Sequence, residues 1–154
     1  MLLGLKMKYK IINYSKECEN QVKKFLMSVA IDEFGFTAWR DYLLNKDFTP
    51  YETGSSLFLI VKDEYGNIIG SCGGLKVNED TIKLNSFYIT KQFRSQKIGS
   101  NLYDRIEMFA RENNFKKIIL CTYARFDIAN IFYQKCGFHL KEKIDDELWQ
   151  EKRL

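Results

Sequence analysis

The sequence is poor in the residues that build linkers, metal sites and membrane spans. It has one proline, Pro50, and nine glycines among 154 residues, so little of it can serve as a flexible linker. The single histidine, His139, and the four cysteines form no CxxC pair, which argues against a structural zinc site. No apolar run is long enough for a secretory signal or a transmembrane helix. We therefore expect no metal and no membrane association.

The composition instead indicates a folded domain. A chain of 154 residues with 45% hydrophobic and 15% aromatic residues can bury a sizeable core, so we expect one domain over residues 1–154. Met7 is an alternative start, which would leave residues 1–7 as a flexible tail. The cysteines are scattered, which is typical of packed, reduced thiols and predicts a cytoplasmic protein. They are Cys18, Cys72, Cys121 and Cys136.

Hydrophobic periodicity predicts seven strands and four helices. The first helix is expected to end near Ala30, and Thr37 to cap a second helix with Trp39, Tyr42 and Leu43 on one face. The strand at 118–123 is apolar on both faces, so it should lie centrally in a sheet. The order predicts an α/β or α+β fold with a mixed sheet and helices on both faces. The expected strands are 9–14, 57–61, 68–77, 81–89, 118–123, 139–144 and 147–152, and the later helices begin near 99 and 127.

One stretch combines a strand, a polar turn and the start of a helix. Residues 84–89 favour a strand, and the turn that follows, 91–97, has Phe93 as its one large apolar residue. Apolar residues then recur at three- and four-residue spacing on one helical face, at Ile98, Leu102, Ile106 and Phe109. A helix start presents free backbone N–H groups and the positive end of a dipole. This arrangement is typical of a phosphate-binding site.

Positive charge is concentrated around the same stretch. Residues 83–117 carry eight basic and three acidic side chains, a local charge of +5, whereas the rest of the chain sums to −1. An anionic cofactor accounts for this surplus. Nucleic acid would also account for it, but a nucleic-acid-binding domain is usually more basic overall and no recognition motif is present. We therefore expect no nucleic-acid partner.

Two motifs resemble one family. The segment Arg94-Ser-Gln-Lys-Ile-Gly99 resembles the acyl-CoA pyrophosphate loop of the GNAT N-acetyltransferase superfamily, Arg/Gln-x-x-Gly-x-Gly/Ala, with Lys97 in place of the middle glycine. The segment 129–138 is similar to the family's Ala-x-x-Phe-Tyr-x-x-x-Gly-Phe. A weaker match, Glu33-Phe34-Gly35, is similar to one bacterial branch. A glycine at position 97 would permit a positive φ, which lysine adopts only at a cost.

The resemblance implies a fold, a co-substrate and a set of site residues. It implies a GNAT-like domain with a central mixed, mostly antiparallel sheet flanked by helices on both faces, and acetyl-CoA as co-substrate. Main-chain groups of the strand before the loop would bind the pantetheine, and the hydroxyl of Tyr133 would protonate the leaving thiolate. The implied pantetheine residues are Phe87, Tyr88 and Ile89, and the implied pyrophosphate residues are Arg94, Ser95, Gln96, Lys97, Ile98, Gly99 and Ser100.

The sequence indicates less clearly which residues bind and deprotonate the acceptor amine. Many relatives have a glutamate base on the strand before the loop, where this chain has Lys83, so that base is missing. Asp32 and Glu33 would flank the acceptor and attract its amine or relay its proton, or they are ordinary solvated carboxylates. Cys121 is read as a core residue, and Tyr133 has the alternative of a packed core tyrosine.

The expected function is therefore an acetyl-CoA-dependent N-acetyltransferase acting on a primary amine by direct attack in a ternary complex. The alternative is a catalytically weak or inactive CoA-binding module, which the residues at positions 83 and 97 keep open. The expected partner is a small-molecule or peptide amine, with a homodimer left open.

Overall fold

The structure is a computed structural model that describes residues 8–94 and 96–154. The prediction of a tail over 1–7 and the assignment of Ser95 to a phosphate loop lie outside these residues.

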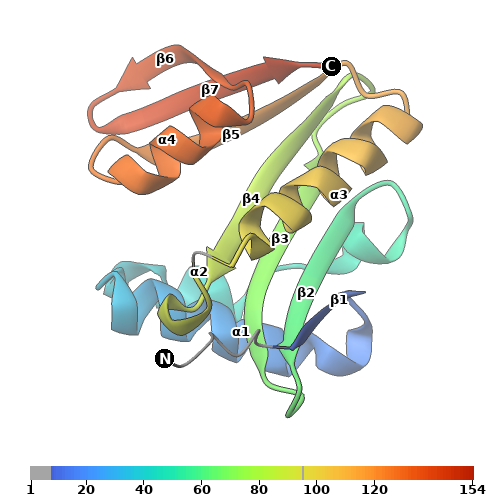
Figure 1. Ribbon diagram of the computed structural model, residues 1–154, viewed down its shortest axis with the longest axis vertical. Helices are drawn as coiled ribbons and strands as arrows, with labels where there is room; N and C mark the ends of the chain where they lie inside the picture. The colour runs from blue at the N-terminus through green and yellow to red at the C-terminus, as the bar shows by residue number, and fades with distance from the viewer. Residues whose placement is uncertain (1–7, 95) are drawn as a thin grey trace, which may run out of the picture.

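Seven strands form one sheet in the order β1-β2-β3-β4-β5-β7-β6 (Figure 1). Every neighbouring pair is antiparallel except β4–β5, which is parallel. The prediction of a mixed, mostly antiparallel sheet is therefore confirmed. The strands are β1 (Tyr9–Asn13), β2 (Leu57–Asp63), β3 (Ile68–Lys76), β4 (Thr81–Ile89), β5 (Lys117–Tyr123), β6 (His139–Ile144) and β7 (Glu147–Arg153).

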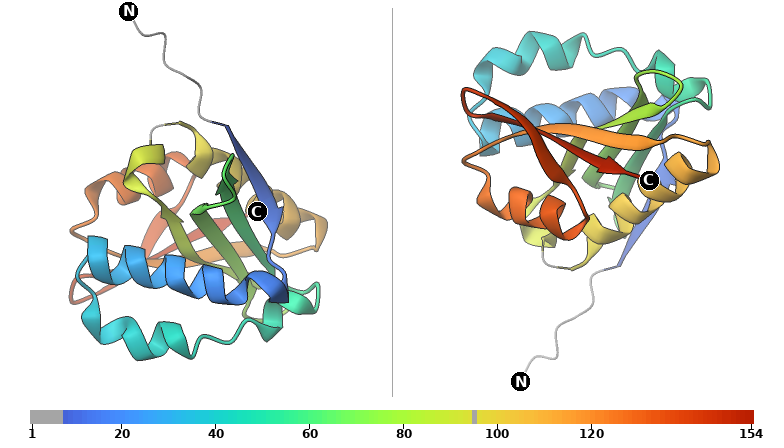
Figure 2. Two further views of the ribbon diagram at one scale, coloured as in Figure 1. Left: turned by 90° about the horizontal axis from the view of Figure 1, so that it is seen from below. Right: turned by 90° about the horizontal axis from the view of Figure 1, so that it is seen from above.

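Helices cover both faces of the sheet, as predicted. Helices α1 (Glu19–Met27) and α2 (Arg40–Leu44) lie on one face, and α3 (Ile98–Glu112) and α4 (Asp127–Lys135) lie on the other, as Figure 2 shows. Each face has its own apolar core. Residues of α3 that recur at helical spacing, such as Leu102 and Ile106, are fully buried against β3 and β4. On the opposite face Val22 and Leu26 of α1 are fully buried against β2.

The bend after the first helix departs from the prediction. The helix was expected to end near Ala30, but residues 28–33 continue as a wide π-helical turn that reaches Glu33. The turn ends at Gly35, whose φ of +72° is a conformation that glycine adopts without strain. The buried Val29 and Ala30 hold this turn against the core, which explains why it persists beyond the predicted break.

The second helix also differs in detail. A 3-10 turn at Thr37–Trp39 precedes α2, and its N-cap is Phe36 with no side-chain hydrogen bond, so the prediction that Thr37 caps the helix is wrong. Leu43 is buried, whereas Tyr42 is 64% exposed and does not share its face. Adjacent positions on a helix point about 100° apart, so one of the pair must face away from the core. A further 3-10 turn, Thr49–Glu52, lies in the expected loop.

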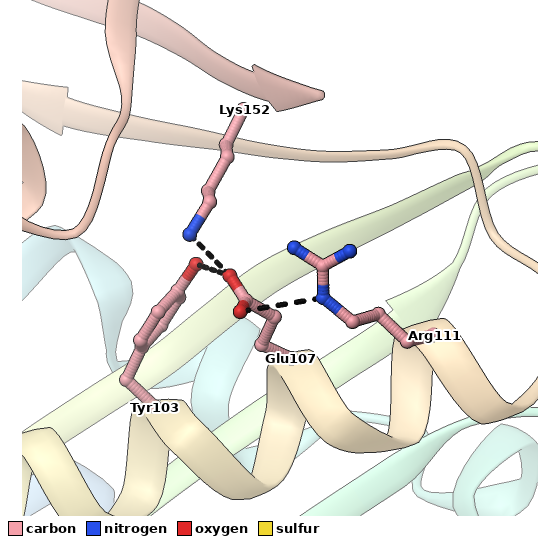
Figure 3. Close-up of polar contacts among 4 residues, drawn as sticks. All are labelled: Tyr103, Glu107, Arg111 and Lys152. Carbon is pink, nitrogen blue, oxygen red and sulfur yellow. Dashed lines mark hydrogen bonds and ion pairs between the residues drawn. The ribbon is translucent and has the colours of Figure 1, made fainter. Parts of the chain in front are cut away.

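A polar cluster ties α3 to the C-terminal strand. The carboxylate of Glu107 accepts hydrogen bonds from the Tyr103 hydroxyl, at 2.8 Å, and from the Lys152 ammonium, and it pairs with Arg111 at 3.4 Å (Figure 3). Burial alone would raise the pKa of Glu107, but the bonds from Lys152 and Tyr103 outweigh it and hold the pKa below its usual 4.5. The cluster therefore favours the charged carboxylate.

We expect Glu107→Gln to destabilise the protein in a pH-dependent way. A depressed folded-state pKa contributes stability above the unfolded value, near pH 4.5, and this stability is lost as the pH falls through the folded value. The variant should lose about 1 kcal/mol, or about 3 °C in Tm, at pH 7. Thermal unfolding followed by circular dichroism should show the gap from wild type narrowing towards pH 3.5. Glu112→Gln, an exposed change on the same helix, is the control, and a gap independent of pH would contradict the assignment.

Candidate active site

The central feature of the site is a split in the sheet. The parallel pair β4–β5 has register contacts only from Thr81 to Lys83 against Lys117 to Ile119. Beyond this point β5 turns away from β4, together with α4, β6 and β7 (Figure 1). Because pairing stops, the edge of β4 that faces β5 is without a strand partner from about residue 84 onwards among the described residues. Unpaired backbone N–H and C=O groups of this kind can bind an extended ligand by strand-like hydrogen bonds.

A bulge in β4 arranges the predicted pantetheine residues. Ser86 has a φ of 50°, and its carbonyl accepts a 2.6 Å hydrogen bond from the hydroxyl of Ser71 on β3. After this bulge Phe87 and Ile89 pack on the core under α3 and α4, whereas Tyr88 packs on the opposite core. The carbonyl of Ile89 accepts a hydrogen bond from Nε of Arg94 at 2.9 Å. The three residues thus lie along the open edge of the split.

The predicted phosphate loop contains a residue with a left-handed backbone conformation. Lys97, the N-cap of α3, has φ 64° and ψ 13°, a left-handed conformation that glycine adopts without strain. The N–H groups of Ile98, Gly99 and Ser100 are in the first turn of α3, where no helical carbonyl can accept them. Gly99 lies over Phe87 and Ile89, where an added Cβ would be 3.4 Å from Ile89 Cδ1. Gln96 is half-buried and Ser100 exposed.

We expect Lys97→Gly to stabilise the protein, because a lysine in the left-handed region costs about 1–2 kcal/mol. The Tm should rise by about 2–4 °C for a chain of this size, as measured by differential scanning calorimetry. Lys97→Ala also removes the charge but keeps the strained Cβ, so it should give no rise. Equal shifts for the two variants would show that charge, and not backbone strain, decides the effect.

Arg94 joins the loop to the bend after α1. Its guanidinium donates to the Ile89 carbonyl, pairs with the carboxylate of Glu33, and lies 6.0 Å from the ring centre of Phe34. Glu33 is therefore engaged with the loop, whereas Asp32 is exposed. The two predicted acceptor residues thus have different surroundings: Glu33 pairs with Arg94, and Asp32 makes no ion pair within the described residues. The side chain of Arg94 thus connects the end of β4 to the bend after α1, two segments that are far apart in the sequence.

Tyr133 of α4 lies opposite β4 across the split. Its ring packs edge-to-face on Phe87, Phe132 and Phe138 at centroid distances of 6.3, 5.7 and 5.9 Å. Burial raises the pKa of the phenol, and the neighbouring Cys72, Tyr88 and Cys136 raise it further. Its hydroxyl makes no hydrogen bond within the described residues, although a core tyrosine usually has one. The phenol is thus held in place, neutral, with a proton to donate.

Aromatic rings connect the end of β5 and the loop after it to the bend before α2. Four ring pairs, with centroids 5.4 to 6.5 Å apart, join the bend before α2 to the end of β5 and the loop after it, and three more pairs lie within these two segments. The guanidinium of Arg125 lies 4.8 Å from the Tyr123 ring and donates to Asp146 at 2.9 Å. We call this set the aromatic bridge: Phe34, Phe36, Trp39, Tyr123 and Phe126. Sequence reasoning missed it, although Phe34, Phe36 and Trp39 lie close together in the chain.

The surroundings of Cys121 on β5 differ from the prediction. Cys121 was expected in a core, but it is half-buried and belongs to neither apolar core, because β5 leaves β4 before this position. Burial, and next the charge of Glu147, raise the pKa of its thiol, so it is not activated as a thiolate nucleophile. Glu147, the cross-strand partner of Tyr123, is a carboxylate that sequence reasoning did not single out. Lys83 extends over the ring of Trp149, 5.0 Å from its centre.

Two further features of the described residues bear on the site. No group of three or more His, Cys, Asp or Glu side chains within 8–94 and 96–154 is placed to share a metal ion. Over the same residues, the structure has no helix whose length and apolar character would let it cross a bilayer.

Comparisons with known proteins agree on one family. The family model described as Acetyltransferase (GNAT) family matches residues 22–138. A GNAT-family acetyltransferase from Staphylococcus aureus Mu50 superposes with a TM-score of 0.84 at 25% identity, covering 96% of this chain and 99% of that one. An acetyltransferase from Streptococcus agalactiae 2603 gives 0.81 at 21% identity, covering 95% and 98%.

A third solved structure was determined with a ligand. The PaiA N-acetyltransferase from Thermoplasma acidophilum, in complex with coenzyme A, superposes with a TM-score of 0.76 at 16% identity and covers 96% of this chain and all of that one. No curated protein sequence matches this chain.

Proposed function

Because this chain belongs to the GNAT acetyltransferase family, we propose that it is an acetyl-CoA-dependent N-acetyltransferase that acetylates a primary amine by direct attack. The observation that carries this proposal is the split between β4 and β5, with the open edge of β4 on one side and Tyr133 on the other. The PaiA structure in complex with coenzyme A supports acyl-CoA as the ligand. A cytoplasmic location belongs to the same proposal.

The binding half of the proposal uses backbone groups. The free N–H groups at the start of α3, residues 98–100, would bind the pyrophosphate, aided by the helix dipole and the charge of Lys97. The pantetheine would add to the open edge of β4 along Phe87, Tyr88 and Ile89. Arg94 would hold this loop in shape through Glu33 and the Ile89 carbonyl, so we assign it a positioning role.

The chemical half needs a neutral amine, a nearby thioester and a proton for the leaving sulfur. The amine nitrogen attacks the thioester carbon, and the C–S bond breaks as the amide forms. Tyr133 gives its proton to the departing thiolate, and the nitrogen loses one proton to solvent, directly or through the exposed carboxylate of Asp32 or the half-buried carboxylate of Glu147 on the acceptor side. The hydroxyl of Tyr133 recovers its proton from solvent.

The alternative is a module that binds CoA without turnover, which the strained Lys97 and the lysine at position 83 favour. Incubation of the purified protein with acetyl-CoA and a panel of primary amines, followed by free-thiol release and mass spectrometry, decides between the two. The enzyme should release thiol and acetylate an amine in equal amounts. Calorimetric CoA binding without thiol release from any amine would favour the module.

A further inference from the structure

A cavity lies next to α2, on the face of the sheet that α1 and α2 cover. Its volume is about 570 Å³. Leu75 of β3, in its lining, is the cross-strand partner of Lys83, and opposed residues of an antiparallel pair lie on the same face of a sheet. Tyr51, also in the lining, exchanges a hydrogen bond with Asn85, two residues after Lys83. The side chain of Lys83 is therefore on the cavity's face of the sheet. The lining residues are Asp41, Tyr42, Asn45, Lys46, Asp47, Pro50, Tyr51 and Leu75.

Two ammonium groups lie on this face, and neither has a counter-ion among the described residues. Lys46 is half-buried and lies 5.9 and 5.7 Å from the ring centres of Tyr42 and Phe48, and Lys83 lies over Trp149. Within residues 8–94 and 96–154 neither ammonium has a carboxylate at ion-pair distance. Aromatic rings attract a cation but do not neutralise it. Burial lowers the pKa of Lys46, and the positive charge of Lys83 lowers it further.

The carboxylates near Lys46 and Lys83 do not act as their counter-ions. Asp47 accepts the backbone N–H of Thr49 at 2.9 Å, and Asp41 makes no ion pair within the described residues. Glu147 lies beside Cys121. Trp149 has a buried indole N–H without an acceptor in the described chain. Because none of these carboxylates is at ion-pair distance from Lys46 or Lys83, an anionic ligand is the partner that would neutralise the two ammonium groups.

We propose that Lys46 and Lys83 form a subsite for the carboxylate of the acceptor, so that the amine substrate is an amino acid or a short peptide. This rests on the proposed acetyltransferase function for the assignment of the ligand as the acceptor. A carboxylate bridging the two ammonium groups would neutralise both, and charge-assisted hydrogen bonds of this kind are among the stronger ones in proteins.

The position of the subsite constrains the acceptor further. Lys83 lies at the closed end of the split, four residues before Phe87, which contacts Tyr133. Four strand residues span about 13 Å. The acceptor amine must reach the thioester near Phe87 while the carboxylate stays near Lys83. This geometry favours an amine and a carboxylate separated by several bonds, as in an ω-amino acid or a peptide, over an α-amino acid.

Steady-state kinetics with paired acceptors test the subsite. Each ω-amino acid is compared with its carboxamide, which has the same shape without the charge. Wild type should prefer the acid by about tenfold or more in kcat/KM, and Lys46→Met and Lys83→Met should each reduce this preference by about 10 to 100-fold, with the carboxamide rate little changed. Lys46→Arg should retain the preference. Lys116→Met, an exposed change in the turn between α3 and β5, is the matched control.

A binding measurement keeps the test independent of turnover. In a Trp39→Phe background, the emission of Trp149 reports on Lys83, and titration with glutarate should give a saturable change that Lys46→Met and Lys83→Met lose and Lys116→Met keeps. Saturable binding with no acetylation of any amine would support the subsite and overturn the proposed function. Acetylation with no preference for acids, together with no glutarate response, would overturn the subsite and leave the acetyltransferase intact.

Discussion

Replacing Tyr133 by phenylalanine is expected to lower kcat by about 10²–10⁴-fold with little change in the KM for acetyl-CoA. The substitution keeps the ring, which packs on Phe87, Phe132 and Phe138, and removes only the hydroxyl. Because the hydroxyl has no hydrogen-bond partner among the described residues, its loss leaves no group of the protein unsatisfied. Stability should therefore be nearly unchanged, and the effect should appear in the chemical step.

The matched control for this prediction is Tyr103→Phe. It removes a hydroxyl from the same face of the sheet, but that hydroxyl bonds to Glu107, away from the split. We expect it to lower Tm and leave kcat unchanged. Pre-steady-state measurement should first establish that acetyl transfer is rate-limiting. Full activity of Tyr133→Phe under that condition would remove Tyr133 from the mechanism.

The pKa of Tyr133 sets the expected pH dependence. Burial raises the pKa of the phenol above its usual 10, so it stays protonated throughout the neutral and moderately alkaline range. As the pH rises, kcat should therefore show no decline caused by Tyr133 below about pH 10. The fall in rate on the acid side should instead follow protonation of the amine, which must be neutral to attack. A wild-type alkaline limb centred near pH 8 that Tyr133→Phe abolishes would contradict this assignment.

Replacing Gly99 by valine is expected to weaken CoA binding by about 10 to 100-fold. A β-carbon at this position would be 3.4 Å from Ile89 Cδ1 and 3.7 Å from Phe87 Cζ, which is ordinary van der Waals contact. The two further methyl groups of valine must then crowd these side chains or project towards the proposed phosphate site. Isothermal titration calorimetry with CoA should show the loss, while circular dichroism shows a folded protein.

Gly99→Ala separates the two causes. Its single methyl group fits the space beside Ile89 and Phe87, so we expect a loss of affinity several-fold smaller than for valine. Unchanged CoA affinity in a folded Gly99→Val protein would place the pyrophosphate elsewhere. A loss of equal size in Gly99→Ala would point to the flexibility of glycine, and not to steric crowding, as the property that matters at this position.

The arrangement around Arg94 connects these predictions to the acceptor side. Its guanidinium contacts the end of β4 and the carboxylate of Glu33 in the bend after α1. The loop proposed for CoA and the bend proposed for the acceptor are thus joined by one side chain. Variants of Arg94 are therefore expected to change both KM values, which distinguishes them from Gly99 variants, whose effect should be confined to CoA.

The sequence by itself determined the elements and the fold class. Apolar residues at period 3.6 in α1 and α3, and β-favouring runs in β2, β4 and β5, are local signals that tertiary contacts did not overrule. The expected ends of α3 and α4 were also correct, because Asn114 and Gly137 take up the positive φ values, 63° and 99°, that end these helices. The two motifs that carried the family resemblance lie in such locally determined segments.

Only the tertiary structure decided how the site is assembled. The half-buried state of Cys121 follows from the loss of β4–β5 pairing after Ile119, which no local pattern encodes. The aromatic bridge and the pairing of Arg94 with Glu33 join residues about 60 to 90 positions apart in the chain. Likewise Lys46 and Lys83 lie on the same face only because β3 sets Leu75, which lines the same cavity as Lys46, opposite Lys83. Such contacts depend on how strands are paired and helices are packed, and a single sequence specifies these only through the whole fold.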